Sequence, residues 1–144
     1  MARFAPGLGV TRSEDFRLLT GGGHFLDDLN MPGQAHAVMV RSPHAHARIR
    51  AIHTEEARAA PGVLAVLTGD DYRNDGLGAL PCLDACRRRD GSPMVAPPHP
   101  ALPRVRVLFV GEAVAMVIAD SAAAARDAAE RVVVDYQPLA AVAG

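Results

Sequence analysis

The clearest alternation of apolar and polar positions lies in residues 107–136, where strands and one helix follow each other with short connections. Residues 113–119 form an apolar run, rich in Val and too short to span a membrane, which indicates a buried strand. Ser121 can cap the helix expected at residues 122–131, and a β-branched strand follows at 132–134. The apolar helix positions recur at i, i+3, i+4 and i+7, on Ala125, Ala128, Ala129 and Val132. We therefore expect an alanine face that lies close to a sheet, in a local β-α-β unit.

A second block, residues 33–71, shows the same order of elements as the first. Pro61 disfavours helical backbone before it, so the short helix of this block, capped by Thr54, is expected to end at Ala60. The expected strands of the two blocks are residues 35–41, 47–52 and 63–68, then 107–110, 113–119 and 132–134. This order predicts an α+β fold of two β-β-α-β halves, joined by a long Pro-rich insertion at about residues 72–103. We expect an N-terminal arm at residues 1–32 and the folded domain at residues 33–144.

Composition narrows the classes of function. The chain has 144 residues and a formal net charge of −1, which argues against a nucleic-acid partner, since phosphate binding needs a basic excess. All of its basic side chains are Arg, so a catalytic or phosphate-binding Lys is excluded. Neither a signal-peptide core nor a membrane-length apolar run is present, and the chain holds only 2 Cys residues. We expect a cytoplasmic protein without a membrane span.

The arm contains a glycine run and an acidic pair. The run at residues 21–23 fits neither a dinucleotide-binding loop nor a Walker loop, so we interpret it as a turn that enters a short strand. Asp27 and Asp28 are adjacent and would point to opposite faces of a strand, which argues against joint acid–base catalysis. Capping or turn formation is the expected role of both.

Metal binding in the insertion is a further hypothesis. Cys82, Cys86 and His99 have a loose zinc-like spacing, but no second ligand pair follows in register. We therefore expect reduced thiols in a surface insertion and no metal site. Residues 87–89 are three consecutive arginines, interpreted as a solvated or docking face.

His44 and His46 flank Ala45 in a turn and could serve as a metal pair or as a catalytic base. Ser42 is only a neighbour in sequence, and no G-x-S-x-G nucleophile elbow is present. We assign no catalytic residue here.

Five segments carry a resemblance to a known family, and the stretch Arg41-Ser-Pro-His-Ala-His46 within them is quite specific. They are residues 22–28, 40–49, 61–70, 110–115 and 125–136. The sequence resembles the N-terminal α/β hammerhead domain of the molybdenum hydroxylases, a family that includes the large, molybdopterin-binding subunits of xanthine dehydrogenase, aldehyde oxidase and carbon monoxide dehydrogenase. The resemblance is greatest to the bacterial branch nearest carbon monoxide dehydrogenase.

The resemblance implies a place in an oxidoreductase complex that hydroxylates a carbon centre or oxidises carbon monoxide. It implies molybdopterin cytosine dinucleotide, iron–sulphur clusters and FAD in the complete enzyme, but none bound by this chain. No catalytic, cofactor-binding or metal residue of the family can be placed here, so the isolated chain is expected to be non-catalytic. Expected partners are the molybdopterin-binding domain or subunit, the iron–sulphur and FAD subunits, and a second copy of the chain. The alternatives are a free-standing binding module with this fold and a small metal-binding or hydrolytic protein.

Overall fold

A computed structural model describes residues 12–81 and 86–141 of the chain. The chain divides into two compact units, Met1–Gln34 and Ala35–Gly144, and each is described by itself. No helix in the described ranges is both long and apolar enough to cross a membrane.

The N-terminal unit holds two short helical segments, α1 at Asp15–Leu19 and the 3-10 turn η1 at Leu26–Asp28. The prediction of a short strand after the glycine run is therefore wrong. The Asp28 carboxylate accepts a hydrogen bond from the Phe25 N–H at 2.9 Å and closes the turn. This contact confirms the turn-forming role that was expected of Asp28.

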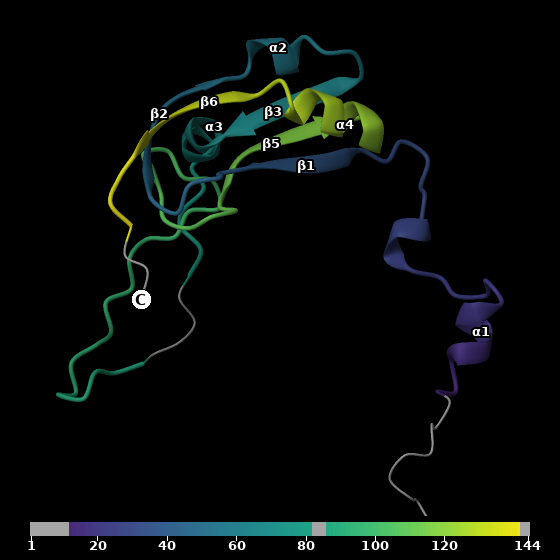
Figure 1. Cartoon of the computed structure of the whole chain (residues 1–144), viewed down its shortest axis with the longest axis horizontal. Helices are drawn as coiled ribbons and strands as arrows, with labels where there is room; N and C mark the ends of the chain where they lie inside the picture. The colour runs from purple at the N-terminus through teal and green to yellow at the C-terminus, as the bar shows by residue number, and fades with distance from the viewer. Residues whose placement is uncertain (1–11, 82–85, 142–144) are drawn as a thin grey trace, which may run out of the picture. The chain divides into compact units, whose positions relative to one another are not determined.

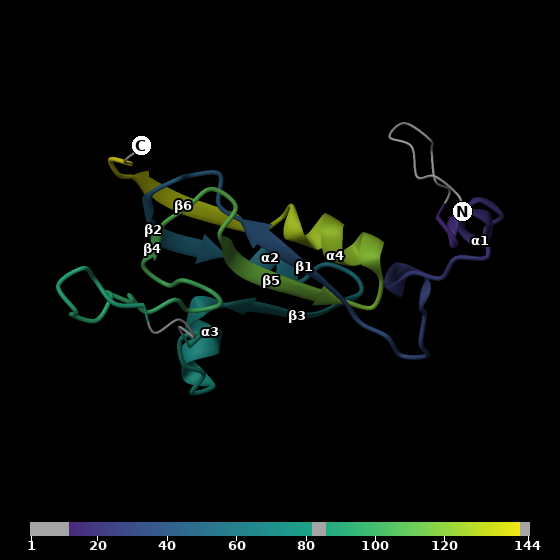
Figure 2. The ribbon, with the colours of Figure 1, turned by 90° about the horizontal axis from the view of Figure 1, so that it is seen from below.

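The second unit contains two antiparallel sheets of three strands each, with strand orders β1-β5-β3 and β4-β2-β6 (Figures 1 and 2). The strands are β1 His36–Arg41, β2 Ala47–His53, β3 Val63–Thr68, β4 Arg106–Val107, β5 Ala113–Ala119 and β6 Val133–Pro138. The helices are α2 Glu55–Arg58, α3 Gly69–Asn74 and α4 Ala122–Ala129. The predicted α+β fold class and the order of two β-β-α-β halves are confirmed.

The two halves exchange their middle strands. In one sheet, β5 of the second half lies between β1 and β3 of the first. In the other sheet, β2 of the first half lies between β4 and β6 of the second. The strands before and after α4 therefore belong to different sheets, and the expected β-α-β unit is correct only as an order along the chain.

Helix α4 begins as predicted and packs through its alanines. The Ser121 hydroxyl accepts from the Ala124 N–H at 3.2 Å, and Ala125 and Ala128 are fully buried. The helix packs against β1 and β5, as Figure 1 shows. The larger core cluster joins α2, α4, β3 and β5 through Ala57, Val66, Ala115, Val117, Ala128 and Val132. Small residues on the helix allow this close approach to the sheet.

Five predicted elements end elsewhere in the structure. Strand β2 ends at His53 rather than at residue 52, and β6 ends at Pro138 rather than at residue 134. Helix α2 ends at Arg58 rather than Ala60, and the Thr54 hydroxyl accepts from the Arg58 side chain instead of capping the helix. The strand expected at residues 107–110 is reduced to β4, because the chain turns outward after Val107. Helix α4 ends at Ala129 rather than at residue 131.

Helix α3 is an element that the sequence analysis missed, and it places Tyr72 in a helix rather than in the insertion. Beyond α3, the described residues of the long connection to β4 pair at two isolated bridges, Leu80 with His99 and Arg87 with Pro93. Figure 1 shows this connection leaving the sheets and returning to β4.

Candidate interaction site

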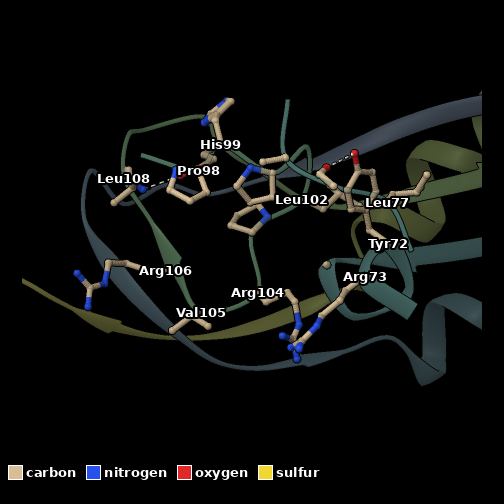
Figure 3. Close-up of a pocket in the computed structure, with 16 residues that line it drawn as sticks. Tyr72, Arg73, Leu77, Pro98, His99, Leu102, Arg104, Val105, Arg106 and Leu108 are labelled. Carbon is tan, nitrogen blue, oxygen red and sulfur yellow. Dashed lines mark hydrogen bonds between the residues drawn. The ribbon is translucent and has the colours of Figure 1, made fainter. Parts of the chain in front are cut away.

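A cleft of about 600 Å³ lies between α3 and the returning end of the connection (Figure 3). Its lining is mainly apolar and includes Leu77, Pro98, Leu102, Val105 and Leu108. A cavity of this size and composition, with a few polar groups at fixed places, is typical of a binding site.

Gly69 brings the two walls of the cleft together. A Cβ at this position would lie 2.8 Å from the carbonyl oxygens of Leu102 and Pro103, closer than atoms pack. Only glycine allows this approach, which leaves Leu102 5% exposed beside the start of α3.

A capping box fixes the first turn of α3. The Asp71 carboxylate accepts from the Thr68 N–H at 2.8 Å and from the Thr68 hydroxyl at 2.7 Å. These bonds, together with Arg58 at 3.5 Å, hold the pKa of Asp71 below its ordinary value. Because Tyr72 and Arg73 directly follow Asp71, the capping box positions two side chains of the cleft.

Three arginines line the cleft. Arg104 forms an ion pair with Asp70, whereas Arg73 and Arg106 pair with no carboxylate in the described part of the chain. In Figure 3 the side chains of Arg73 and Arg104 extend toward the same side, whereas Arg106 lies apart from them and extends away. One carboxylate, Glu112, is also in the lining; it is 5% exposed and accepts from the Leu108 N–H.

A second hollow, of about 440 Å³, shares Leu108 with the cleft. Its lining includes Phe109 and Val110, which are 48% and 64% exposed, on the segment that follows β4. His46 lies on the opposite side, where its Nδ1 is 2.7 Å from the Ala140 carbonyl oxygen. The two hollows and the exposed segment at residues 108–110 form one largely apolar surface.

Polar groups of Ser42, Glu112 and Tyr136 form a cluster next to this surface, and Glu112 belongs to both. Ser42 is 2% exposed, and its N–H donates to the Glu112 carbonyl at 2.9 Å. The Tyr136 hydroxyl is buried and forms no hydrogen bond of ordinary geometry with the described residues. Burial raises its pKa, and the nearby Ser42 hydroxyl opposes this only in part. The His44 ring packs edge-on against the Tyr136 ring, with centroids 4.9 Å apart.

The structure gives the His44/His46 turn a structural role rather than a nucleophile–base geometry. The Ser42 hydroxyl accepts from the backbone N–H of His44 at 3.0 Å and donates to its carbonyl oxygen. Neither bond involves the imidazole ring, and His46 is occupied with Ala140. The geometry therefore does not support the hydrolytic alternative.

The two described residues of the metal hypothesis, Cys86 and His99, do not belong to a common cluster of possible ligands. Cys82 lies outside the described residues, and Cys86 is an exposed free thiol. His99 stacks on Phe109 with ring centroids 6.3 Å apart. Within residues 12–81 and 86–141, no three His, Cys, Asp or Glu side chains are grouped so that they could hold a metal ion.

Sequence reasoning missed the cleft and its arginines. One signal was available: Arg104 and Arg106 alternate with Val105 and Val107, which places basic side chains on one side of an extended segment.

The arrangement of two sheets with exchanged middle strands is that of an α/β hammerhead. Residues 20–140 match the family described as "Aldehyde oxidase and xanthine dehydrogenase, a/b hammerhead domain". The chain belongs to this family, and it corresponds to the hammerhead portion of molybdenum hydroxylase large subunits.

Individual relatives agree with this assignment. The chain is 40% identical over 135 residues to the carbon monoxide dehydrogenase large chain of Afipia carboxidovorans, covering 92% of this chain and 15% of that one. It is 41% identical over 144 residues to the nicotine 6-hydroxylase large subunit of Paenarthrobacter nicotinovorans, covering 99% and 17%. Among solved structures, quinoline 2-oxidoreductase from Pseudomonas putida 86 matches with a TM-score of 0.72 and 40% identity, covering 94% of this chain and 16% of that one. The chain thus spans about a sixth of the length of these relatives.

Proposed function

We propose that this chain serves as the docking and structural portion of a molybdenum-dependent oxidoreductase, with residues 33–144 as the hammerhead domain and residues 1–32 as an arm. The observation that carries this proposal is the apolar surface formed by the cleft, the second hollow and residues 108–110. Exposed apolar patches of this kind mark sites where proteins meet. In relatives of which the chain matches about a sixth, a much larger part of the polypeptide is available to meet such a surface.

Under this proposal, other domains or subunits of the enzyme carry out the catalytic reaction. The complete enzyme would use molybdopterin cytosine dinucleotide, iron–sulphur clusters and FAD, as the resemblance implies. Within the described residues, no three His, Cys, Asp or Glu side chains are grouped as ligands of an iron–sulphur cluster would be. We assign no step of the reaction to residues of this chain.

Replacement of a relative's own segment tests the proposal. The aligned 135-residue segment would be deleted from the Afipia carboxidovorans carbon monoxide dehydrogenase large chain, and this chain would be supplied separately. We expect the two polypeptides to co-elute in size-exclusion chromatography with light scattering. The relative's own segment, supplied in the same way, is the positive control.

Two results would contradict the proposal. One is a complex that forms with the relative's own segment but not with this chain. The other is hydroxylase or carbon monoxide oxidising activity from the purified chain alone, which would show that it is catalytic.

A further inference from the structure

We propose that the cleft between α3 and β4 receives an acidic, apolar segment of the partner polypeptide, with its carboxylates against Arg73 and Arg106. This inference rests on the docking role proposed above and names the chemistry of the docked segment. Three observations support the inference: the apolar floor of the cleft, the unpaired arginines and the continuity of the floor with the second hollow.

The floor of the cleft is open and apolar. Leu77, Val105 and Leu108 are 53%, 60% and 53% exposed, although all three line the same concave surface. Scattered exposed apolar residues are ordinary, but their convergence in one cleft leaves a large apolar area in water. An apolar side chain of a partner would remove this area from water and be stabilised by the hydrophobic effect.

The charges around the floor select for an anion. Arg106 lies directly opposite Arg48 in the pairing of β4 with β2, and like charges at opposed positions of a sheet are destabilising. Neither Arg48 nor Arg106 forms an ion pair with a carboxylate among the described residues, and the same is true of Arg73 on α3. Arg73 and Arg106 place unpaired positive charge on two sides of the cleft in a chain of net charge −1, which is complementary to carboxylates at the two ends of a partner segment. Arg104 contributes less, because Asp70 already neutralises it.

The shape of the surface favours an extended polypeptide over a compact small molecule. Leu108 lines both the cleft and the second hollow, so the apolar floor continues past Phe109 to His46. An extended segment can place one side chain in each hollow, because successive side chains on one face of a strand are two residues apart. A compact ligand would fill only one of them.

Assembly with the deleted large chain described above tests the inference through charge reversal. The double variant Arg73→Glu/Arg106→Glu should weaken assembly roughly tenfold and reduce its dependence on salt, as expected when charges at an interface are reversed. Arg126→Glu is the matched control, because Arg126 is exposed on α4 and does not line the cleft. Circular dichroism verifies that each variant folds. If the unaltered chain assembles and the double variant assembles equally well, this inference is wrong and the docking role stands.

A defined peptide tests the chemistry without the partner. The probe is acetyl-Glu-Leu-Ser-Phe-Glu-amide, whose Leu and Phe are two residues apart and share one face when extended. It is compared with its Gln-Leu-Ser-Phe-Gln and Glu-Gly-Ser-Gly-Glu counterparts, and binding is followed by NMR shifts of the cleft residues. We expect only the first peptide to shift Tyr72, Leu77 and Leu108, and the double variant to abolish the shifts. Equal binding of all three peptides would overturn the inference. Tighter binding of 1-naphthoate than of the first peptide would also overturn it in favour of a small-molecule site. Peptide binding by a chain that does not assemble would support the cleft chemistry while the docking role failed.

Discussion

Replacement of Asp71 by Asn is the most informative single perturbation, because Asp71 fixes α3 and α3 forms one wall of the cleft. The Asp71 carboxylate accepts both from the N–H and from the hydroxyl of Thr68, at 2.8 and 2.7 Å. Asn keeps the shape and one acceptor but loses the negative charge. Hydrogen bonds to an ionised acceptor are about twice as strong as those between neutral groups.

The size of the effect follows from these contacts. The difference between charge-assisted and neutral hydrogen bonds gives a loss of about 1 kcal/mol in the free energy of unfolding at neutral pH. For a folded unit of this size, that loss corresponds to a Tm lower by about 4 °C. Arg58 adds little, because it lies 3.5 Å away and both side chains are partly exposed.

The pH dependence of the free energy of unfolding follows from the direction of the pKa change at Asp71. The pKa of Asp71 is lowered in the folded state, so its contribution to stability is present above the ordinary value of 3.8 and is lost as pH falls through the folded value. Urea unfolding between pH 2.5 and 7 should therefore show the unaltered chain and Asp71→Asn converging in acid. The variant should also bind the acidic peptide more weakly, although Asp71 does not line the cleft.

Asp127→Asn is the matched control, because Asp127 is exposed on α4 and its carboxylate forms no hydrogen bond or ion pair within the described residues. A stability difference for Asp71→Asn that is constant from pH 2.5 to 7, or one that Asp127→Asn reproduces, would refute the reasoning.

Three further substitutions or cuts test other parts of the fold. Gly62→Ala should cost about 1–2 kcal/mol in urea unfolding, since Gly62 has φ +79° and a Cβ there would lie 2.6 Å from the Asp120 carboxylate, whereas Gly78→Ala, in open space, should change little. Tyr136→Phe should stabilise the chain by about 1 kcal/mol because it removes a buried hydroxyl without a described partner, and Tyr72→Phe should cost about as much because its hydroxyl donates to the Gly78 carbonyl at 3.0 Å; destabilisation by Tyr136→Phe would contradict the assignment of an unsatisfied group. Cleavage between Gly91 and Ser92 should give two fragments that are unfolded when separate and fold when mixed, as measured by circular dichroism, since each sheet takes its middle strand from the other half; a fragment that folds alone would contradict this.

Local elements could be predicted where a period or a cap is strong. The apolar run of β5, the alternation of β2 and the alanine face of α4 each specify an element by themselves, and all three occur as expected. Helix α3 was missed because its sequence begins with Gly69 and two aspartates, a composition typical of turns. The capping signal was nevertheless present, since Thr68 and Asp71 stand at the spacing of a capping box.

The sheets and the cleft depend on contacts between distant residues, which no local pattern specifies. The apolar sequences of β1 and β5 indicate two strands, but they do not say that these strands pair with each other rather than with their neighbours in sequence. The cleft depends on the return of Leu102 to Gly69 after a long excursion with many prolines and no period. Its arginines come from α3, from β4 and from the segment just before β4, so they are far apart in the sequence.

The exchange of middle strands bears on where the proposed docking surface lies. Each connection between consecutive strands in this unit crosses from one sheet to the other, and the two that contain α2 and α4 are held by the packing of these helices against the strands. The connection from α3 to β4 joins the two halves and can carry an excursion without disturbing the register of either sheet. Its two ends are held firmly, by the Asp71 capping box at α3 and by the pairing of Arg106 and Val107 with β2. A surface carried between two rigid attachments can differ in sequence while the core stays the same, which is the arrangement expected of a docking element under the proposed function.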